Sequence, residues 1–174
     1  MEFDKHFFRK NFFKLERYRV SADKRHEDAP EDDEATVKIL VPKKNAAGKI
    51  PDRYIAEYQP EDRKFLALTA TANGQGPVDA MDQALRKLLA PIYSFMKEIR
   101  LVRYSVDNIS FKDGTSAEVE VFILASNKSG KLYFSEVRSR SVVEASFFAL
   151  ANIYNRYFSD EYAGKKKTKI KGKD

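Results

Sequence analysis

Apolar and polar residues alternate along several short stretches of this chain, as they do in strands that keep one face in water. In residues 14–20 (KLERYRV) the alternation predicts such a strand. Comparable patterns predict further strands at 35–42, 64–72, 99–106, 117–123 and 131–137. A weaker pattern predicts a short extra strand at 54–58. The chain is therefore expected to hold two sets of three main strands.

Two other stretches have apolar residues every three or four positions, which predicts helices. The first helix begins at Pro77, whose fixed φ suits a first helical turn, and Asp79 and Asp82 in that turn complement the helix dipole. Its buried stripe is expected to comprise Val78, Met81, Leu85, Leu88 and Ile92. The second helix covers 142–154 and opens with a serine N-cap and the glutamate of a capping box at 141–144.

The pattern of the first half recurs in the second half. Leu15, Arg17, Tyr18 and Val20 are matched by Leu101, Arg103, Tyr104 and Val106, and Ala80, Ala84 and Leu85 by Ala145, Ala149 and Leu150. Each half is too small to close a core alone. We therefore predict an α+β fold of duplicated βββα units, 13–92 and 98–158, related by pseudo-twofold symmetry, with helices packed on antiparallel sheets.

Three segments lie outside this repeat. Residues 1–12 form an aromatic N-terminal arm, which together with Phe13 holds five phenylalanines. The arm is expected to pack on the protein's own core or on a dimer mate, or alternatively to dock onto another protein. Residues 43–63 are an insertion in the first unit, and 159–174 are expected to be a basic disordered tail, which leaves 13–158 as the folded domain.

The net charge of +6 is concentrated at the C-terminus, where 164–174 hold six lysines and one aspartate. Such a tail is usually solubilising, and weak binding to RNA or to an acidic partner is an alternative use of it.

The chain has no cysteine, which excludes disulfides, thiolate zinc sites and a cysteine nucleophile. No apolar run approaches the roughly 20 residues of a membrane span, and no signal peptide is present. We expect a cytoplasmic protein with no membrane partner.

Residues that could assemble an active site are scarce. Of the two histidines, His6 lies in the aromatic arm and His26 in an acidic loop at 24–34, neither beside a partner on a rigid element. Carboxylates of a flexible loop rarely hold a metal without ordered ligands. Hydroxyls near the second helix are explained by capping and packing. We predict a binding domain with no catalytic residue, no metal site and no cofactor.

The connection between the third strand and the first helix contains two glycines, Gly74 and Gly76, followed by Pro77. Free N–H groups at a helix start can bind an anion, a carboxylate as readily as a phosphate. Alternatively, the glycines only allow a tight strand-to-helix turn, since a G-x-G by itself is weak evidence. Both interpretations stay open on this stretch alone.

The order of three motifs along the chain favours a binding site over a simple strand-to-helix turn. These are GQGPVDA at 74–80, DGTSAEV at 113–119 and VVEASFFAL at 142–150. Together they resemble the C-terminal regulatory domain of α-isopropylmalate synthase and citramalate synthase, over residues 13–157. The resemblance implies a duplicated β3α domain that dimerises and binds the pathway's end product, leucine or isoleucine, which inhibits a separate TIM-barrel acyltransferase. That barrel and its metal-binding histidine pair are absent from this sequence.

The resemblance also implies which residues hold the effector. A free amino acid needs N–H donors for its carboxylate, carbonyls for its ammonium group and a small apolar hole. Implied effector-binding residues are Gly74, Gln75, Gly76, Val78 and Asp79, with Tyr104, Ala117 and Val142 lining the remainder. Where relatives have V-G-V-S before the second helix, this chain has EVRS at 136–139. Val137 and Arg138 would narrow one of the two pseudo-equivalent sites, or leave the domain unable to bind.

Our first hypothesis is a homodimeric sensor of leucine or isoleucine that serves as a separate regulatory subunit of an acyltransferase. Leucine cannot be distinguished from isoleucine here, because apolar pockets separate such ligands by only about 1–3 kcal/mol per methylene. The alternatives are a dimerisation or adaptor module with a degenerate effector pocket, and a nucleic-acid binder that uses the basic tail.

Overall fold

A computed structural model describes residues 12–23, 32–46, 50–59, 61, 64–109 and 117–171 of the chain. The strands are β1 (Lys14–Asp23), β2 (Asp32–Pro42), β3 (Phe65–Gly74), β4 (Ile99–Asn108), β5 (Val119–Asn127) and β6 (Leu132–Ser139). The α-helices are α1 (Lys43–Ala46), α2 (Pro77–Leu89) and α3 (Val142–Lys171), and short 3-10 helices occupy Asp52–Tyr54 (η2) and Ser94–Glu98 (η3). Three strands followed by a long helix occur twice, which confirms the predicted α+β class.

The six strands form two antiparallel sheets with the same construction. Their orders are β1-β2-β3 and β4-β5-β6. In the first sheet the pairing of β1 with β2 shifts between Leu15 and Arg17, and in the second sheet the pairing of β4 with β5 shifts between Leu101 and Arg103. An irregularity at the same place in both sheets is the structural mark of the duplication, because bulges are specific features of a strand pair.

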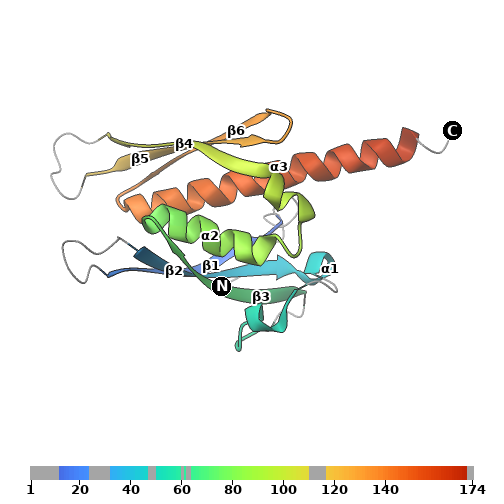
Figure 1. Ribbon diagram of the computed structural model, residues 1–174, viewed down its shortest axis with the longest axis horizontal. Coiled ribbons are helices and arrows are strands. Elements are labelled where there is room, and N and C mark those ends of the chain that lie inside the picture. The colour runs from blue at the N-terminus through green and yellow to red at the C-terminus, as the bar shows by residue number, and fades with distance from the viewer. Residues whose placement is uncertain are drawn as a thin grey trace.

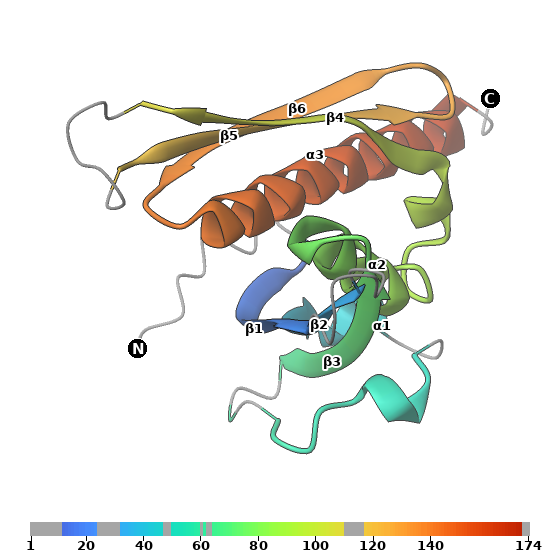
Figure 2. The ribbon, with the colours of Figure 1, turned by 60° about the vertical axis from the view of Figure 1, so that its left-hand side comes forward.

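Both long helices lie between the two sheets (Figures 1 and 2). Helix α2 packs on β2 and β3, whereas α3 packs on β5 and β6. On the inner faces every second residue is buried, as strand geometry requires; examples are Val37 and Ile39 on β2 and Val121 and Ile123 on β5. Full burial of one such side chain contributes about 1.5–3 kcal/mol, so the helices join the two sheets around one core.

An aromatic cluster closes one end of this core. The ring of Phe12 lies 5.8 Å from those of Tyr93 and Phe158, and the Tyr93 hydroxyl donates to the Phe12 carbonyl at 3.0 Å. Asn155 on α3 accepts a hydrogen bond from the Phe12 N–H at 2.7 Å. The last residue of the predicted arm therefore packs on the protein's own core. The part of the arm at 1–11 lies outside the described residues.

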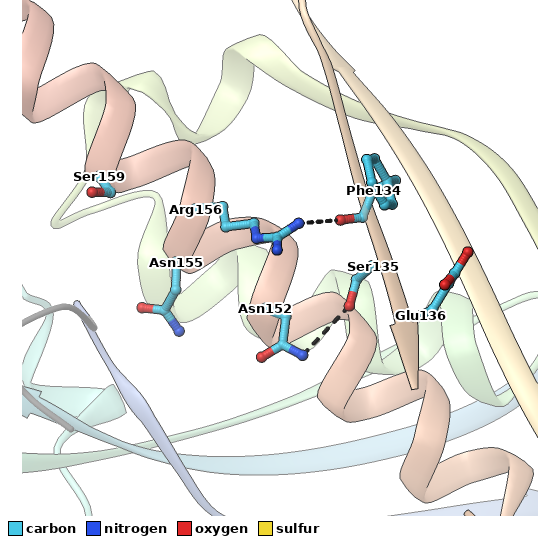
Figure 3. A pocket seen from close by; sticks show the side chains of 7 residues that line it. All are labelled: Phe134, Ser135, Glu136, Asn152, Asn155, Arg156 and Ser159. Atoms are coloured by element: carbon cyan, nitrogen blue, oxygen red, sulfur yellow. Dashed lines mark hydrogen bonds between the residues drawn. The ribbon is translucent and has the colours of Figure 1, made fainter. Parts of the chain in front are cut away.

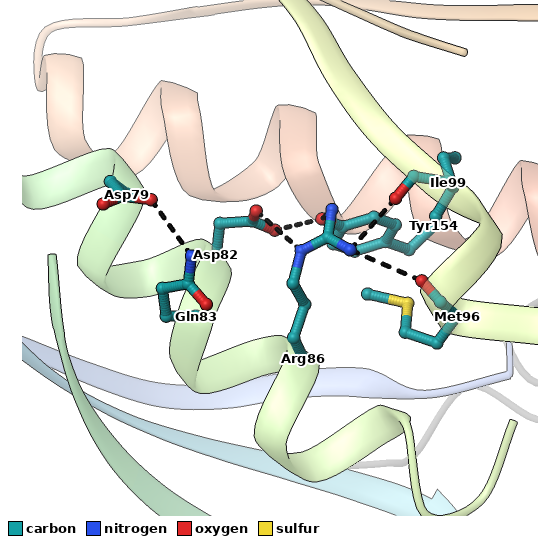
Figure 4. Close-up of polar contacts among 7 residues, drawn as sticks. All are labelled: Asp79, Asp82, Gln83, Arg86, Met96, Ile99 and Tyr154. Atoms are coloured by element: carbon teal, nitrogen blue, oxygen red, sulfur yellow. Dashed lines mark hydrogen bonds and ion pairs between the residues drawn. The ribbon is translucent and has the colours of Figure 1, made fainter. Parts of the chain in front are cut away.

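A polar network joins α2 to α3 (Figure 4). Asp82, which is buried, accepts hydrogen bonds from Arg86 Nε at 2.8 Å and from the Tyr154 hydroxyl. Arg86 also donates to the Tyr154 hydroxyl at 3.0 Å and to the Ile99 carbonyl at 3.0 Å. The two halves are thus connected by a buried carboxylate with two polar partners, Arg86 and Tyr154, in addition to apolar packing.

Two predicted boundaries were wrong. Helix α2 ends at Leu89, so Ile92 lies in the following turn, and Asp82 belongs to the second helical turn. The helix ends next to Pro91, whose nitrogen carries no hydrogen to donate to the preceding turn, although Ala90 itself keeps helical φ and ψ. Residues 54–58 do not form a strand: only Ile55 makes a bridge, to Leu68. Gln59 uses its side chain instead, and its Oε1 accepts from the Ala67 N–H at 3.0 Å.

Helix α3 also differs from the expectation. It continues past 154 to Lys171, through most of the segment 159–174 for which we expected a disordered tail. In the sequence, an acidic residue at 161 precedes a lysine at 165 by four positions, which is a spacing that favours a helix. The acidic loop residues 24–31 lie outside the described part of the chain.

Candidate functional site

The turn between β3 and α2 depends on both of its glycines. A Cβ on Gly74 would lie 2.3 Å from the backbone nitrogen of Ala80, so only glycine lets the strand end lie against the helix. Gly76 has φ of 126°, a conformation that side chains other than glycine rarely adopt. It is the N-cap of α2 but offers no capping side chain, and the space beside its Cα is open. The first turn of α2 therefore keeps backbone N–H groups that no N-cap side chain covers.

Asp79 lies in the first turn of α2 and is oriented toward the connection. Its Oδ2 accepts a hydrogen bond from the Gln75 N–H at 2.9 Å, and its Oδ1 accepts from Gln83 Nε2 at 3.3 Å. A carboxylate here is favoured by the helix dipole. The site thus combines uncapped amides with one fixed negative charge, which suits a ligand that carries both signs.

The equivalent turn before α3 is filled by side chains. Ser141 caps the helix, and its Oγ accepts from the Glu144 N–H at 3.2 Å, which is the first of the two bonds of the predicted capping box. Ser139, the counterpart of Gly74, donates its hydroxyl to Glu144 at 2.5 Å and accepts from the Ser141 N–H at 3.1 Å. At the start of α3, the two serines therefore accept from backbone N–H groups. At the start of α2, the equivalent positions are glycines, which have no side chain to accept from such groups.

The remaining predicted effector residues lie around the start of α3. The Tyr104 hydroxyl is 2.9 Å from Ser146 Oγ, and Ser146 donates to the Val142 carbonyl at 2.7 Å. Tyr104 and Val142 are 41% and 39% exposed, which is high for apolar side chains beside a core. Ala117 is buried and lies just before β5, whose Val119 pairs with Ser139. The structure thus places Tyr104 and Val142 at the start of α3 and the glycine-turn residues at the start of α2, while Ala117 lies just before the strand that pairs with β6.

Comparison of the two halves shows what is special about Tyr104. Its counterpart Tyr18 packs its ring against Phe147 of α3, at 4.7 Å between centroids. Burial, and then the charge of Glu144, raises the pKa of Tyr18, so the start of α3 lies near β1. The residue of α2 equivalent to Phe147 is Asp82, which is turned toward Arg86 and Tyr154 (Figure 4). No equivalent aromatic ring therefore covers Tyr104.

Arg138 does not enter either helix start. It lies on the face of β6 that is turned away from the helices, its side chain is 64% exposed, and its Nε donates to Glu120 at 2.5 Å. Val137 is partly buried against the core. Of the residues at 136–139 that differ from the relatives, Ser139 is the one whose side chain lies in the turn before α3.

A pocket of about 700 Å³ lies elsewhere, between the edge strand β6 and α3 (Figure 3). It is lined by Phe134, Ser135, Glu136, Asn152, Asn155, Arg156 and Ser159. Arg156 donates to the Phe134 carbonyl at 2.8 Å and Asn152 to Ser135 Oγ at 3.4 Å, so its polar groups largely satisfy one another. Arg156 also shields a backbone carbonyl at the open edge of the sheet. None of the predicted effector residues lines this pocket.

The described residues offer little for chemistry. Within those ranges, no three side chains of His, Asp or Glu come together in a way that could hold a metal ion. No helix in the described part of the chain is both long and apolar enough to cross a membrane. The features available at the helix starts are N–H donors, the carboxylates of Asp79 and Glu144, and apolar surface.

Comparison with known sequences decides the family. A family model, the LeuA allosteric (dimerisation) domain, matches residues 2–158. The chain belongs to this family. The LeuA domain is 32% identical over 160 residues to an (R)-citramalate synthase of Geobacter sulfurreducens, and 34% identical over 157 residues to an (R)-citramalate synthase of Aquifex aeolicus. These alignments cover 91% and 89% of this chain, but only 26% and 25% of the relatives. The LeuA domain described here thus spans about a quarter of their length.

Sequence reasoning missed the Asp82, Arg86 and Tyr154 network of this LeuA domain. One signal was available, because Asp82 and Arg86 are four residues apart on one helix face. The third member, Tyr154, comes from a helix 72 residues along the chain, so only the tertiary structure could supply it. The serine-filled turn before α3 was partly visible, since the hydroxyls of Ser139, Ser141 and Ser146 were expected to serve capping and helix packing. The particular bonds of Ser139 to Glu144 and Ser141 came from the structure.

Proposed function

We propose that this domain is a regulatory module that binds a branched-chain amino acid between the start of α2 and the exposed face of Tyr104, and that it performs no catalysis of its own. The observation that carries the proposal is the difference between the two helix starts. The first turn is uncapped and open at Gly76, whereas the serines Ser139 and Ser141 fill the second. One working site per chain, formed at α2, follows from this difference.

The chemistry of the first turn suits an amino-acid zwitterion. Its carboxylate would accept from N–H groups of the first turn of α2, in the region of Val78 and Asp79. Asp79 offers a negative charge for the ammonium group, beside the Gln75 backbone. The pseudo-twofold relation makes Tyr104 the counterpart of Tyr18 and Asp79 the counterpart of Glu144. Because the charge of Glu144 reaches Tyr18, Tyr104 is expected to lie toward Asp79.

The apolar part of the ligand would pack on Tyr104, Val142 and Ala117. Asp82 stands at the position from which Phe147 covers Tyr18 in the other half, and we propose that a small aliphatic side chain of the ligand takes the place of that ring beside Tyr104. The relatives reported above are named citramalate synthases. Of the two effectors implied by the resemblance, we therefore propose isoleucine ahead of leucine. The partner that responds is proposed to be a synthase catalytic domain.

Thermal unfolding with isoleucine, leucine and valine tests this proposal. A ligand at one hundred times its dissociation constant stabilises the folded state by about 2.7 kcal/mol, so Tm should rise with isoleucine concentration. Gly76→Ala should abolish the shift, because a Cβ would disturb the turn and occupy its open side. Gly130→Ala is the matched control: Gly130 also has positive φ, 82°, but lies in the remote β5–β6 hairpin.

The outcomes separate the hypotheses. If none of the three amino acids at millimolar concentration moves Tm, the sensor proposal fails and a dimerisation or adaptor role is left. If Gly130→Ala and Gly76→Ala lose the shift equally, the effect is one of general stability and the site is elsewhere. RNA binding that survives removal of the segment 164–174 would instead support the nucleic-acid alternative.

A further inference from the structure

The insertion at 43–63 leaves and rejoins the first sheet at the end where α1 lies (Figure 1). Pro42, the last residue of β2, pairs with Phe65, the first residue of β3. Beyond this pair the Lys43 N–H donates to the Lys64 carbonyl at 2.9 Å. A pocket of about 370 Å³ lies here, within the range of about 300–1,000 Å³ that is typical of small-molecule sites. It is lined by Pro42, Lys43, Lys44, Lys64 and Phe65.

The duplication shows that the fold itself does not need this pocket. When the registers of the two sheets are matched, the three residues equivalent to Pro42, Lys64 and Phe65 are residues 128, 129 and 130. In the second half these are consecutive residues of the short turn that joins β5 to β6. A direct turn is thus sufficient to connect the two strands. The three lysines of the first half are therefore not explained by the strand connection.

The pocket combines positive charge with apolar surface. The side chains of Lys43, Lys44 and Lys64 are exposed, whereas Pro42 is buried and Phe65 is half-buried. No acid is among the described residues that line the pocket, and neither Lys43 nor Lys44 forms an ion pair with a described residue. Like charges at one pocket repel one another, so an anion that lies among the three ammonium groups is attracted by all of them.

The chemistry of the lining residues indicates the class of ligand. A lysine ammonium group binds phosphate as a compact point charge, and a terminal phosphate carries about two negative charges near neutral pH. The ring of Phe65 can stack on a flat aromatic group, as aromatic side chains do with nucleobases. We infer that this pocket binds a nucleoside diphosphate, with its phosphates among the three lysines and its base on Phe65. None of these residues belongs to the proposed effector site, so the inference does not rest on the proposed function.

Isothermal titration calorimetry with ADP tests the inference, with adenosine and inorganic pyrophosphate as partial ligands. ADP should bind with a dissociation constant below about 1 mM and more tightly than either partial ligand, because only ADP carries both the phosphates and the base. Added salt should weaken binding, since the lysines are exposed and their charges are screened.

Two variants separate the contributions of charge and stacking. Lys43→Gln combined with Lys44→Gln should weaken ADP binding by at least about tenfold, because two charge-assisted contacts are lost. Both side chains are exposed, so circular dichroism and Tm should stay close to those of the unchanged chain. Phe65→Leu should weaken the binding of ADP but leave that of pyrophosphate unchanged, since pyrophosphate has no base to stack.

Lys97→Gln combined with Lys128→Gln is the matched control. Both lysines are exposed and lie outside the pocket, so this variant changes the net charge equally and should keep ADP binding. The inference is overturned if ADP does not bind at millimolar concentration, or if both double variants lose binding equally, because net charge alone would then attract the ligand. It is also overturned if pyrophosphate binds as tightly as ADP. These readouts do not use isoleucine, so this inference and the proposed function can fail separately.

Discussion

Asp82 is the residue whose environment most constrains the molecule. A buried carboxylate is costly unless it is paired, and here Arg86 and Tyr154 supply the partners from two helices (Figure 4). Its counterpart in the other half is Phe147, so the two halves use different chemistry at equivalent places. Where α3 has the ring of Phe147, α2 has the carboxylate of Asp82. Asp82 bonds α2 to Tyr154 of α3, and it does not cover Tyr104 as Phe147 covers Tyr18.

Removal of Arg86 should therefore be strongly destabilising. Arg86→Met leaves Asp82 buried beside only the Tyr154 hydroxyl, and we expect a loss of about 3–5 kcal/mol in the free energy of unfolding. Urea denaturation monitored by circular dichroism measures this loss. Lys131→Met is the control, because it breaks an ion pair with Asp160 in which both side chains are well exposed. It should leave the midpoint unchanged, and equal losses in both variants would contradict the assignment.

Tyr154 is expected to make the free energy of unfolding fall at alkaline pH. Burial, and then the charge of Asp82, raises the pKa of Tyr154 well above its usual value. Above about pH 10 the unfolded chain releases this proton while the folded chain retains it, so the unfolded state binds fewer protons and stability falls as pH rises. The slope from one such group is up to about 1.4 kcal/mol per pH unit.

Urea midpoints between pH 8 and about pH 11 measure this dependence. Tyr154→Phe should be less stable near neutral pH, since Asp82 loses a donor, but its stability should fall less steeply above pH 10. Tyr58→Phe, at an exposed tyrosine, should keep the full slope. If Tyr154→Phe has the same slope as the unchanged chain, the alkaline loss arises from other groups.

At the scale of elements, the starts of the helices were predictable from sequence and their ends were not. Pro77 and the N-cap Ser141 are local signals that specify where a helix begins, and both predictions are confirmed. The return bond of the predicted capping box is not formed, because the Ser141 N–H donates to Ser139 and Glu144 accepts from the Ser139 hydroxyl. The end of α2 at Leu89 was predicted wrongly, because the spacing of Ile92 continues the apolar stripe of the helix past Pro91. The continuation of α3 to Lys171 was also missed, because a lysine-rich composition is as typical of a disordered segment as of an exposed helix.

The placement of the implied effector residues shows the same division. The glycine turn was recognisable as a tight connection, and the structure explains both glycines through a close approach and a positive φ. The second turn could not be judged from Val137 and Arg138, because strand alternation turns Arg138 outward and leaves Ser139 facing the helix. A one-residue difference in register decided which side chain fills the site.

Gly74 tests the strand-to-helix connection itself. Gly74→Ala puts a Cβ 2.3 Å from a backbone nitrogen that cannot rotate away, so β3 or α2 must shift. We expect a loss of about 1–3 kcal/mol in the free energy of unfolding, as in an overpacked core. Ser139→Ala at the equivalent position should cost about 1 kcal/mol or less through its hydrogen bonds alone. Calorimetry or urea denaturation distinguishes the two, and a larger loss for Ser139→Ala would contradict the close packing at Gly74.

At the scale of the whole molecule, the duplication assigns separate roles to the two sides of the second sheet. Its inner face holds Tyr104 beside the starts of the helices, and its outer face holds Phe134 and its apolar neighbours. Strand alternation keeps these two sets of side chains apart. Effector binding is therefore expected to depend on the residues of the inner face and not on those of the outer face, even though both belong to one sheet.

Tyr104→Ala provides the test of this dependence. It should reduce the rise in Tm that isoleucine produces in the unchanged chain, at equal ligand and protein concentrations, because the hydroxyl of Tyr104 faces α3. Phe134→Ala is the control: Phe134 is exposed on the opposite face of the same sheet, so this variant should keep the full ligand shift. If both variants lose the shift equally while circular dichroism stays unchanged, the outer face contributes to effector binding and the proposed site is misplaced.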